Sequence, residues 1–372
     1  MKAMKCPYCG SRMKKNGKTK AGRQRWRCKA CGASSVKRYN SASHDLKVFL
    51  DWLLFKDVQL DMPGCGRTFR RHAEKFWRIW PMPPVVDEIH RVIHIDGIWL
   101  GRDAVVLIAC SEEHVLSWHL ARAESSISYS ALLSKIAPPE MVVSDGGTGF
   151  TKACRKNWPG VKVQRCLFHA FCQVKRYTTS RPNLLAGIEL YGLAKDLMRI
   201  ETLHQADLWV ERYLNWCEFW SDFLEEKSFI DGKRQYTHLR LRKARSSLSR
   251  LVNAGTLFTY LDPALCHEER MPSTNNRIEG AVNTQLRAVL RNHRGMSLTR
   301  RIKAVFWWCL MHTECPPDAR TILEEMPTDD DIDALHELYG VKPKDGLEPV
   351  EWGDGIVWSE FHHSTPYPYS VS

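Results

Sequence analysis

The stretch Val92–Leu100 places the strongest constraint on how this chain can fold. It is short, apolar and rich in β-branched residues, and one acid, Asp96, lies near its centre. Such a composition is typical of a strand that is buried on both faces of a sheet. A buried carboxylate needs a cation, a metal or a hydrogen-bond network as its partner, because desolvation disfavours the charge. From this stretch alone, Asp96 and Gly97 could equally form a turn, since Asp-Gly is a common turn pair.

A second apolar stretch, Met141–Ser144, also ends in an acid, Asp145. Between the two, the pattern predicts strands at 104–110 and 115–121 and a helix at 126–136; a helix at 150–158 and a strand at 161–165 follow. Three antiparallel strands, a crossover helix and further parallel strands are the order of an α/β, RNase H-like fold. In that order the first and fourth strands are neighbours, so Asp96 and Asp145 should lie together. Paired aspartates are hard oxygen ligands that suit Mg²⁺ or Mn²⁺.

A third acid, Glu279, falls in the first turns of a helix expected to open near residue 272 and to end at Gly295. Ser, Thr and Asn before it offer N-cap chemistry. Two strand aspartates and a helix glutamate make a DDE constellation, which can hold two Mg²⁺ ions about 3.5–4 Å apart to activate water or a 3′-hydroxyl. Alternatively, Glu279 is only an acid favoured by the helix dipole.

The N-terminal forty residues contain two CxxC pairs, Cys6/Cys9 and Cys28/Cys31, separated by eighteen residues. Two such knuckles complete a closed tetrahedral site, so we expect one structural Zn²⁺ in a zinc ribbon. Residues 1–44 hold 13 Lys or Arg and no acid, with Arg25 and Arg27 flanking Trp26. This basic face fits contact with DNA phosphates better than sequence reading.

A helix at 44–56, a turn at 62–66 and a basic helix at 68–80 predict a helix-turn-helix. Arg70, Arg71 and Lys75 are its candidate DNA contacts; a connecting helical hairpin with a basic exposed side remains the alternative.

From 181 to 266 the pattern is helical, with no convincing strand. The domains expected are a ribbon (1–40), a helix-turn-helix (41–84), a sheet core (85–175), an all-helical insertion (176–270), final core helices (271–315) and an acidic tail (316–372).

Net charge is unevenly distributed along the chain. Its total is +12, but residues 316–372 contain 13 acids and 3 bases, so the first 315 carry about +22. A body that basic indicates a polyanionic partner such as double-stranded DNA. No apolar run is long enough to span a bilayer, and no apolar leader precedes the first Cys pair, so we expect a cytoplasmic protein without a membrane partner.

The motif from Thr274 to Gly280 (TNNRIEG), followed by Arg287 and by His293-Arg294-Gly295, resembles the third-acid region of Mutator-like bacterial transposases. Asp96-Gly97 and Ser144-Asp145-Gly146 match the first and second acid motifs of this insertion-sequence-256 family. Cys166-Leu167-Phe168-His169 matches its CxxH signature; as residues alone, that spacing resembles half a zinc finger without a second half. The ribbon is most similar to the insertion-sequence-1249 group, and the resemblance covers roughly residues 1–315.

The resemblance implies a DNA transposase that binds the terminal inverted repeats of its element and cuts and joins strands with Asp96, Asp145 and Glu279. Arg287, Arg291 and Arg294 would contact phosphates nearby, and Cys166 and His169 would support the second acid's strand without a metal. Such enzymes act as homo-oligomers on DNA, here in the bacterial nucleoid. The alternatives are an inactive, transposase-derived DNA-binding regulator and a host nuclease. The acidic tail would be either solvated surface or an autoinhibitory DNA mimic.

Overall fold

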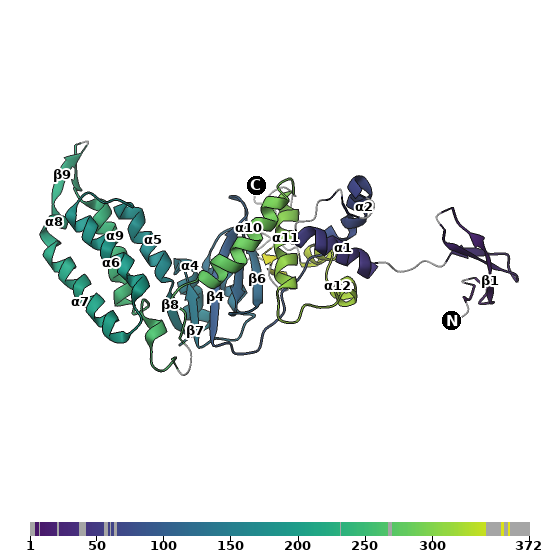
Figure 1. Ribbon diagram of the computed structural model, residues 1–372, viewed down its shortest axis with the longest axis horizontal. Helices are drawn as coiled ribbons and strands as arrows, with labels where there is room; N and C mark the ends of the chain where they lie inside the picture. Colours follow the sequence, from purple (N-terminus) through teal and green to yellow (C-terminus); the bar gives the residue numbers. More distant parts are fainter. Residues whose placement is uncertain are drawn as a thin grey trace.

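The computed structural model describes residues 4–6, 8–20, 22–36, 42–55, 59, 61–62, 65–230, 232–266, 270–339, 351–352 and 356–357. Over this part of the chain, helices flank a mixed sheet, and a small three-stranded unit lies apart at the N-terminal end (Figure 1). Within the same residues, no helix combines the length and the apolar character that crossing a bilayer requires.

The central sheet has the strand order β11-β12-β6-β5-β4-β7-β8. Its members are β4 (Val92–Trp99), β5 (Val105–Cys110), β6 (Val115–Ala121), β7 (Met141–Ser144), β8 (Lys162–Arg165), β11 (Glu351–Trp352) and β12 (Ile356–Val357). Strands β4, β5 and β6 are antiparallel, while β7 pairs in parallel with both β4 and β8. The expected adjacency of the first and fourth strands is therefore confirmed.

Both faces of the sheet are covered, which explains the continuous apolar character of β4. On one face, Ile93 and Ile95 pack with α3 (Ser126–Leu133) and α4 (Thr148–Asn157). On the other, Ile98 belongs to a cluster with α11 (Leu298–Met311). A strand buried on two sides cannot alternate polar and apolar residues, so Asp96 stands out as the exception.

Two N-terminal helices, α1 (Ala42–Leu54) and α2 (Cys65–Trp77), pack on α11 as the helix pair that the sequence predicts. Phe49 of α1 makes edge contacts with Trp77 of α2 and with Trp307 of α11. This aromatic junction fixes both helices to the sheet core, since buried aromatic side chains dominate such contacts. The pair is thus part of the main body and does not hang from a linker.

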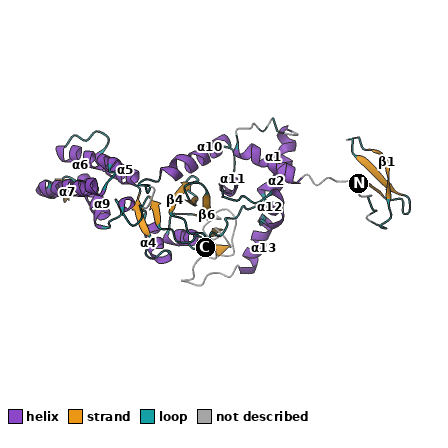
Figure 2. Ribbon diagram, turned by 60° about the horizontal axis from the view of Figure 1, so that its bottom comes forward, coloured by secondary structure: helices purple, strands orange, loops and turns teal. Residues whose placement is uncertain are grey.

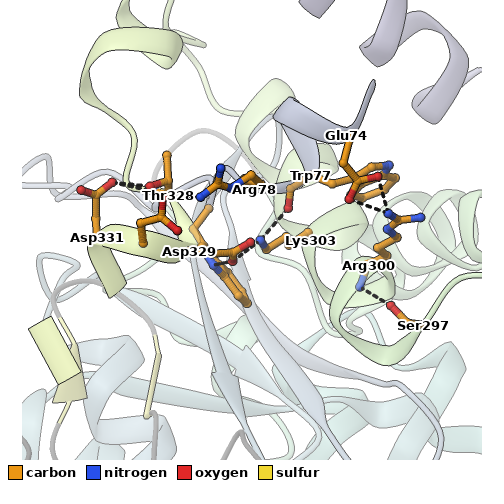
Figure 3. Close-up of polar contacts among 11 residues, drawn as sticks. Glu74, Trp77, Arg78, Ser297, Arg300, Lys303, Thr328, Asp329 and Asp331 are labelled. Atoms are coloured by element: carbon orange, nitrogen blue, oxygen red, sulfur yellow. Dashed lines mark hydrogen bonds and ion pairs between the residues drawn. The ribbon is translucent and has the colours of Figure 1, made fainter. Parts of the chain in front are cut away.

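The segment after residue 316 corrects the expectation of a plain acidic tail. It forms α12 (Ala319–Glu325) and α13 (Asp329–Tyr339), and Ile322 and Ile332 are buried in the main core. Asp329 Oδ1 accepts hydrogen bonds from Lys303 Nζ at 2.6 Å and from Trp80 Nε1 at 2.7 Å (Figure 3). Because the Lys303 side chain is 1% exposed, Asp329 supplies the anion that a buried ammonium requires. The acids at 345, 348, 354 and 360 lie outside the described residues.

The insertion between sheet and final helices is mainly helical, built around a stack of Trp209, Tyr213 and Trp216. Its helices are α5 (Leu167–Thr178), α6 (Leu185–Asp196), η1 (Leu197–Arg199), α7 (Leu203–Phe219), α8 (Ser221–Glu225), α9 (Leu239–Asn253) and η2 (Thr259–Leu261). The prediction of no strand was wrong here. Strands β9 (Lys227–Ile230) and β10 (Lys233–Tyr236) form an antiparallel hairpin at the far tip (Figure 1). Their polar, basic sequence lacks the apolar alternation that marks a half-buried strand.

The N-terminal unit is a three-stranded antiparallel sheet of β1 (Met13–Lys18), β2 (Gln24–Cys28) and β3 (Ser34–Val36). Arg25 and Arg27 are exposed on β2, with Trp26 half-buried between them, as the alternation predicts. Its apolar cluster contains only ribbon residues such as Met13 and Trp26. So small a core is insufficient for folding without a staple.

Candidate active site

Asp96 and Asp145 meet at one edge of neighbouring strands. Ile95 of β4 is in register with Ser144 of β7, so the residue that follows each of them lies at the same level of the sheet. Asp96 Oδ1 accepts the backbone N–H of Gly97 at 2.9 Å, and Asp145 Oδ1 accepts that of Gly147 at 3.1 Å. Since Asp96 lies within β4, the alternative of a turn at Asp96-Gly97 is wrong.

Glu279 reaches the same region from a different element, and its helix differs from the expected one. Residues Arg277–Asn283 form a π-helix, η3, which leads into α10 (Thr284–Asn292). Asn283, one turn after Glu279, donates from Nδ2 to Asp96 Oδ2 at 2.8 Å. A π-helical turn is rare and is found most often at functional sites. The hydrogen bond from Asn283 therefore ties the third acid's helix directly to the first acid.

The asparagines before Glu279 have another role than the capping expected of them. Asn276, at the N-cap, makes no side-chain capping bond. The buried Asn275 instead donates from Nδ2 to Ile95 O at 2.9 Å, and its Oδ1 lies 3.0 Å from His94 Nδ1. Both partners belong to β4, so Asn275 fixes the start of η3 against the strand that carries Asp96.

The acids affect one another's protonation. Burial, together with the negative charges of Asp145, Glu279 and Glu124, raises the pKa of Asp96 to about 7, although the hydrogen bond from Gly97 opposes this shift. Like charges in a partly desolvated site favour a proton or a cation between them. Among the described residues, however, the oxygens of Asp96, Asp145 and Glu279 do not form a group within 4.8 Å of one another, as two cysteine-containing clusters do.

Glu124 is a fourth acid of this region that the sequence did not single out. Its Oε1 would lie 2.7 Å from a Cβ placed on Gly97, and it accepts a hydrogen bond from Trp99 Nε1 at 2.9 Å. Burial raises the pKa of Glu124. The hydrogen bond from Trp99 opposes this shift, and the negative charge of Asp145 adds to it. In sequence it precedes the N-cap of α3, where acids are common for helical reasons alone.

Arg165, at the end of β8, also borders the site. Burial lowers the pKa of its guanidinium, while the charge of Asp145 acts in the opposite direction. A Cβ on Gly146, which has φ +74°, would lie 2.3 Å from Arg165 Nη1. The space beside Gly146 is therefore taken by the buried side chain of Arg165.

Cys166 donates its backbone N–H to Ser144 O at 2.9 Å, next to Asp145, and the side chains of Cys166 and His169 lie beside Glu279. Glu279 Oε1 is 3.3 Å from His169 Nδ1 and 3.9 Å from Cys166 Sγ. The three side chains form a compact group with all ligand atoms within 4.8 Å. The CxxH motif places its two side chains one helical turn apart at the start of α5, so both face the same neighbour.

The four ribbon cysteines converge as predicted. Sγ atoms of Cys6 and Cys31, of Cys9 and Cys28, and of Cys9 and Cys31 are each 3.5 Å apart. All four ligand atoms lie within 4.8 Å of one another, so this cluster could bind a structural zinc ion. The donor set of four thiols fits Zn²⁺ in a closed tetrahedral site.

The predicted DNA-contacting bases fall into two groups. Arg287, Arg291 and Arg294 are exposed along and just after α10. The helices α10 and α1 are drawn in Figure 2, and His293 Nε2, at the end of α10, lies 3.0 Å from Leu53 O of α1. Arg70 of α2 joins Arg294 in lining a hollow of about 720 Å³. Arg71 is exposed, but Lys75 is ion-paired with Asp45 at 2.9 Å, so its charge is partly neutralised.

No model of a protein family and no curated protein matches this chain.

Proposed function

We propose that this protein is a DNA transposase with an RNase H-like catalytic core, in which Asp96, Asp145 and Glu279 hold two Mg²⁺ or Mn²⁺ ions. The observation that carries the proposal is the adjacency of Asp96 and Asp145 on parallel strands, with the helix of Glu279 hydrogen-bonded to Asp96. The raised pKa of Asp96 supports the same proposal, because a charged carboxylate at this position is unfavourable without a cation beside it. When bound, the ions would activate the attacking water or 3′-hydroxyl and stabilise the leaving oxygen.

The remaining residues of the site position the substrate and the acids. Asn275 and Asn283 orient η3 on β4, so that Glu279 and Asp96 keep a fixed separation. Glu124, whose charge acts on Asp96, would be a further oxygen ligand. Arg165 partly balances the charge of Asp145 when no cation is bound.

The path of the DNA follows from the exposed bases. Arg287 and Arg291 occupy successive turns of α10, and Arg294 opens into the hollow shared with Arg70. A duplex along this line would run from the acids to α2, the helix-turn-helix candidate, so that base reading and strand cleavage act on one DNA end. The ribbon's basic face would add phosphate contacts outside this line.

Cleavage of a labelled duplex that carries the inverted repeats bracketing the gene, with Mg²⁺ present, tests the proposal. We expect Asp96→Asn to lower the cleavage rate by at least about 1,000-fold, because a metal ligand is lost. Asp103→Asn is the matched control, since Asp103 is exposed in the loop after β4. If the wild type binds this DNA without cutting it, the protein is a DNA-binding regulator and not a transposase. If Asp96→Asn cuts the DNA at the normal rate, the assignment of the active site is wrong.

A further inference from the structure

Glu279 faces two kinds of neighbour, and only one of them belongs to the acid site. One side of its helix is tied to Asp96 through Asn283. Its Oε1, however, points to the sulfur of Cys166 and to Nδ1 of His169. A thiol and an imidazole are poor partners for Mg²⁺, which prefers oxygen, and good ones for Zn²⁺.

We propose that Cys166, His169 and Glu279 form a three-ligand site for one thiophilic divalent ion such as Zn²⁺, separate from the ribbon. Tetrahedral zinc with ordinary bond lengths separates its ligand atoms by roughly 3.4–3.6 Å. The distances from Glu279 Oε1 to the other two ligand atoms are 3.3 and 3.9 Å. Small side-chain shifts therefore suffice to bind the ion, and its fourth position stays open.

The surroundings of the two softer ligands favour metal binding. Cys166 precedes the first residue of α5, and its sulfur accepts the backbone N–H of Asn275 at 3.2 Å. This amide fixes the position of the sulfur beside Glu279, but burial raises the pKa of the Cys166 thiol, so a metal must displace its proton on binding. His169 Nδ1 makes no hydrogen bond within the described part of the chain and lies 3.3 Å from Glu279 Oε1, so a neutral imidazole with its proton on Nε2 would offer Nδ1 to an ion beside that carboxylate. With 32% of its side chain exposed, His169 also gives an ion a way in.

A consequence rests on the proposed transposase function. Zinc held by Cys166 and His169 competes with Mg²⁺ for Glu279, so occupation of this site opposes cleavage. Site-bound zinc would thus act as an inhibitor, whereas ribbon zinc is needed for folding.

Zinc stoichiometry of the reduced, full-length protein tests the site without any DNA. After saturation with Zn²⁺ and gel filtration against a weak chelator, we expect two ions per wild-type chain. Cys166→Ser and His169→Ala should each retain one. Cys172→Ser is the matched control on the same helix and should retain two, because Cys172 lies outside the cluster.

Thermal unfolding of each variant separates loss of a ligand from loss of the fold. If Cys166→Ser destabilises the core, the zinc content of His169→Ala decides whether the site exists, because the His169 side chain is partly exposed. The proposal is overturned if the wild type binds only one zinc ion per chain, or if His169→Ala still binds two. Asp96→Asn should keep two ions even though it abolishes the proposed cleavage, so failure of the zinc site and failure of the transposase function give different results.

Discussion

The cysteine ribbon and the carboxylate site differ in how their ligands are brought together. The ribbon takes four thiols from residues 6–31, whose own apolar cluster is very small. The carboxylates of Asp96, Asp145 and Glu279 come from two strands and a distant π-helix, which a large core holds in place. A unit with so small a core should need a bound metal for folding, whereas the scaffold holds the carboxylates near one another despite their repulsion.

The largest expected effect is on the ribbon. Cys28→Ser should release the ribbon's zinc and unfold residues 4–36, because structural zinc supplies on the order of 10 kcal/mol to such units. Limited proteolysis should then remove the ribbon, while the melting temperature of the main body stays unchanged. Cys315→Ser, at an exposed position outside the cluster, is the control and should change neither readout. A ribbon that resists protease in Cys28→Ser would mean that its strands fold without metal.

The next effect concerns pH and has opposite signs in the two regions. With the pKa of Asp96 raised from 3.8 to about 7, the unfolded chain releases this proton near pH 4 and the folded protein only near pH 7. The free energy of unfolding of the metal-free protein should fall across that window, by roughly 2–4 kcal/mol. Ribbon zinc is instead lost as pH falls, because its thiols become protonated.

Denaturant unfolding in chelator at pH 5 and pH 8 isolates the carboxylate contribution, since the ribbon is then metal-free at both. Asp96→Asn should lose much of the pH dependence, and Asp103→Asn should keep it. The same slope in wild type and Asp96→Asn would show that Asp96 ionises normally and is not desolvated.

The last comparison, with effects no larger than the pH effect, uses two glycines that share a positive φ. Gly10 in the ribbon has φ +70° and open space around it, whereas Gly146 has φ +74° and contacts Arg165. Alanine should destabilise the ribbon by about 1 kcal/mol and the main body by about 2–4 kcal/mol, because only Gly146 adds a steric clash. Thermal unfolding measures the effect of Gly146→Ala on the main body, and the rate of zinc release measures the effect of Gly10→Ala on the ribbon. Partial recovery in Gly146→Ala with Arg165→Lys would identify the guanidinium as the cause; equal losses at both glycines would contradict it.

Much of the fold could be predicted because its signals are local. The strand at Val92, the strands at Val105 and Val115 and the helix at Ser126 agree with the structure within a few residues, because runs and periodic spacing of apolar residues mark them. The β9–β10 hairpin was missed because its two strands, KSFI and KRQY, are short and carry no periodic apolar signal. The packed α12 and α13 were missed because charge dominates that segment, and only the partners of Ile322 and Asp329 show that it is docked.

The candidate site was predictable only in part. The roles of Asn275 and Asn283, the proximity of Glu124 and the pairing of Gly146 with Arg165 all depend on contacts between distant segments. Cys166 and His169 could be noticed by their spacing, but not their third neighbour, Glu279.

The sequence by itself determined the four-thiol cluster and the strand order that places Asp96 beside Asp145. Both follow from rules that act over short spacings or on the order of elements. Only the tertiary structure decided that Glu279 lies beside Cys166 and His169, while Asn283 of the same π-helix is hydrogen-bonded to Asp96. The position of a helix on a sheet is set by packing over its whole length, and the residues of the helix alone do not specify it.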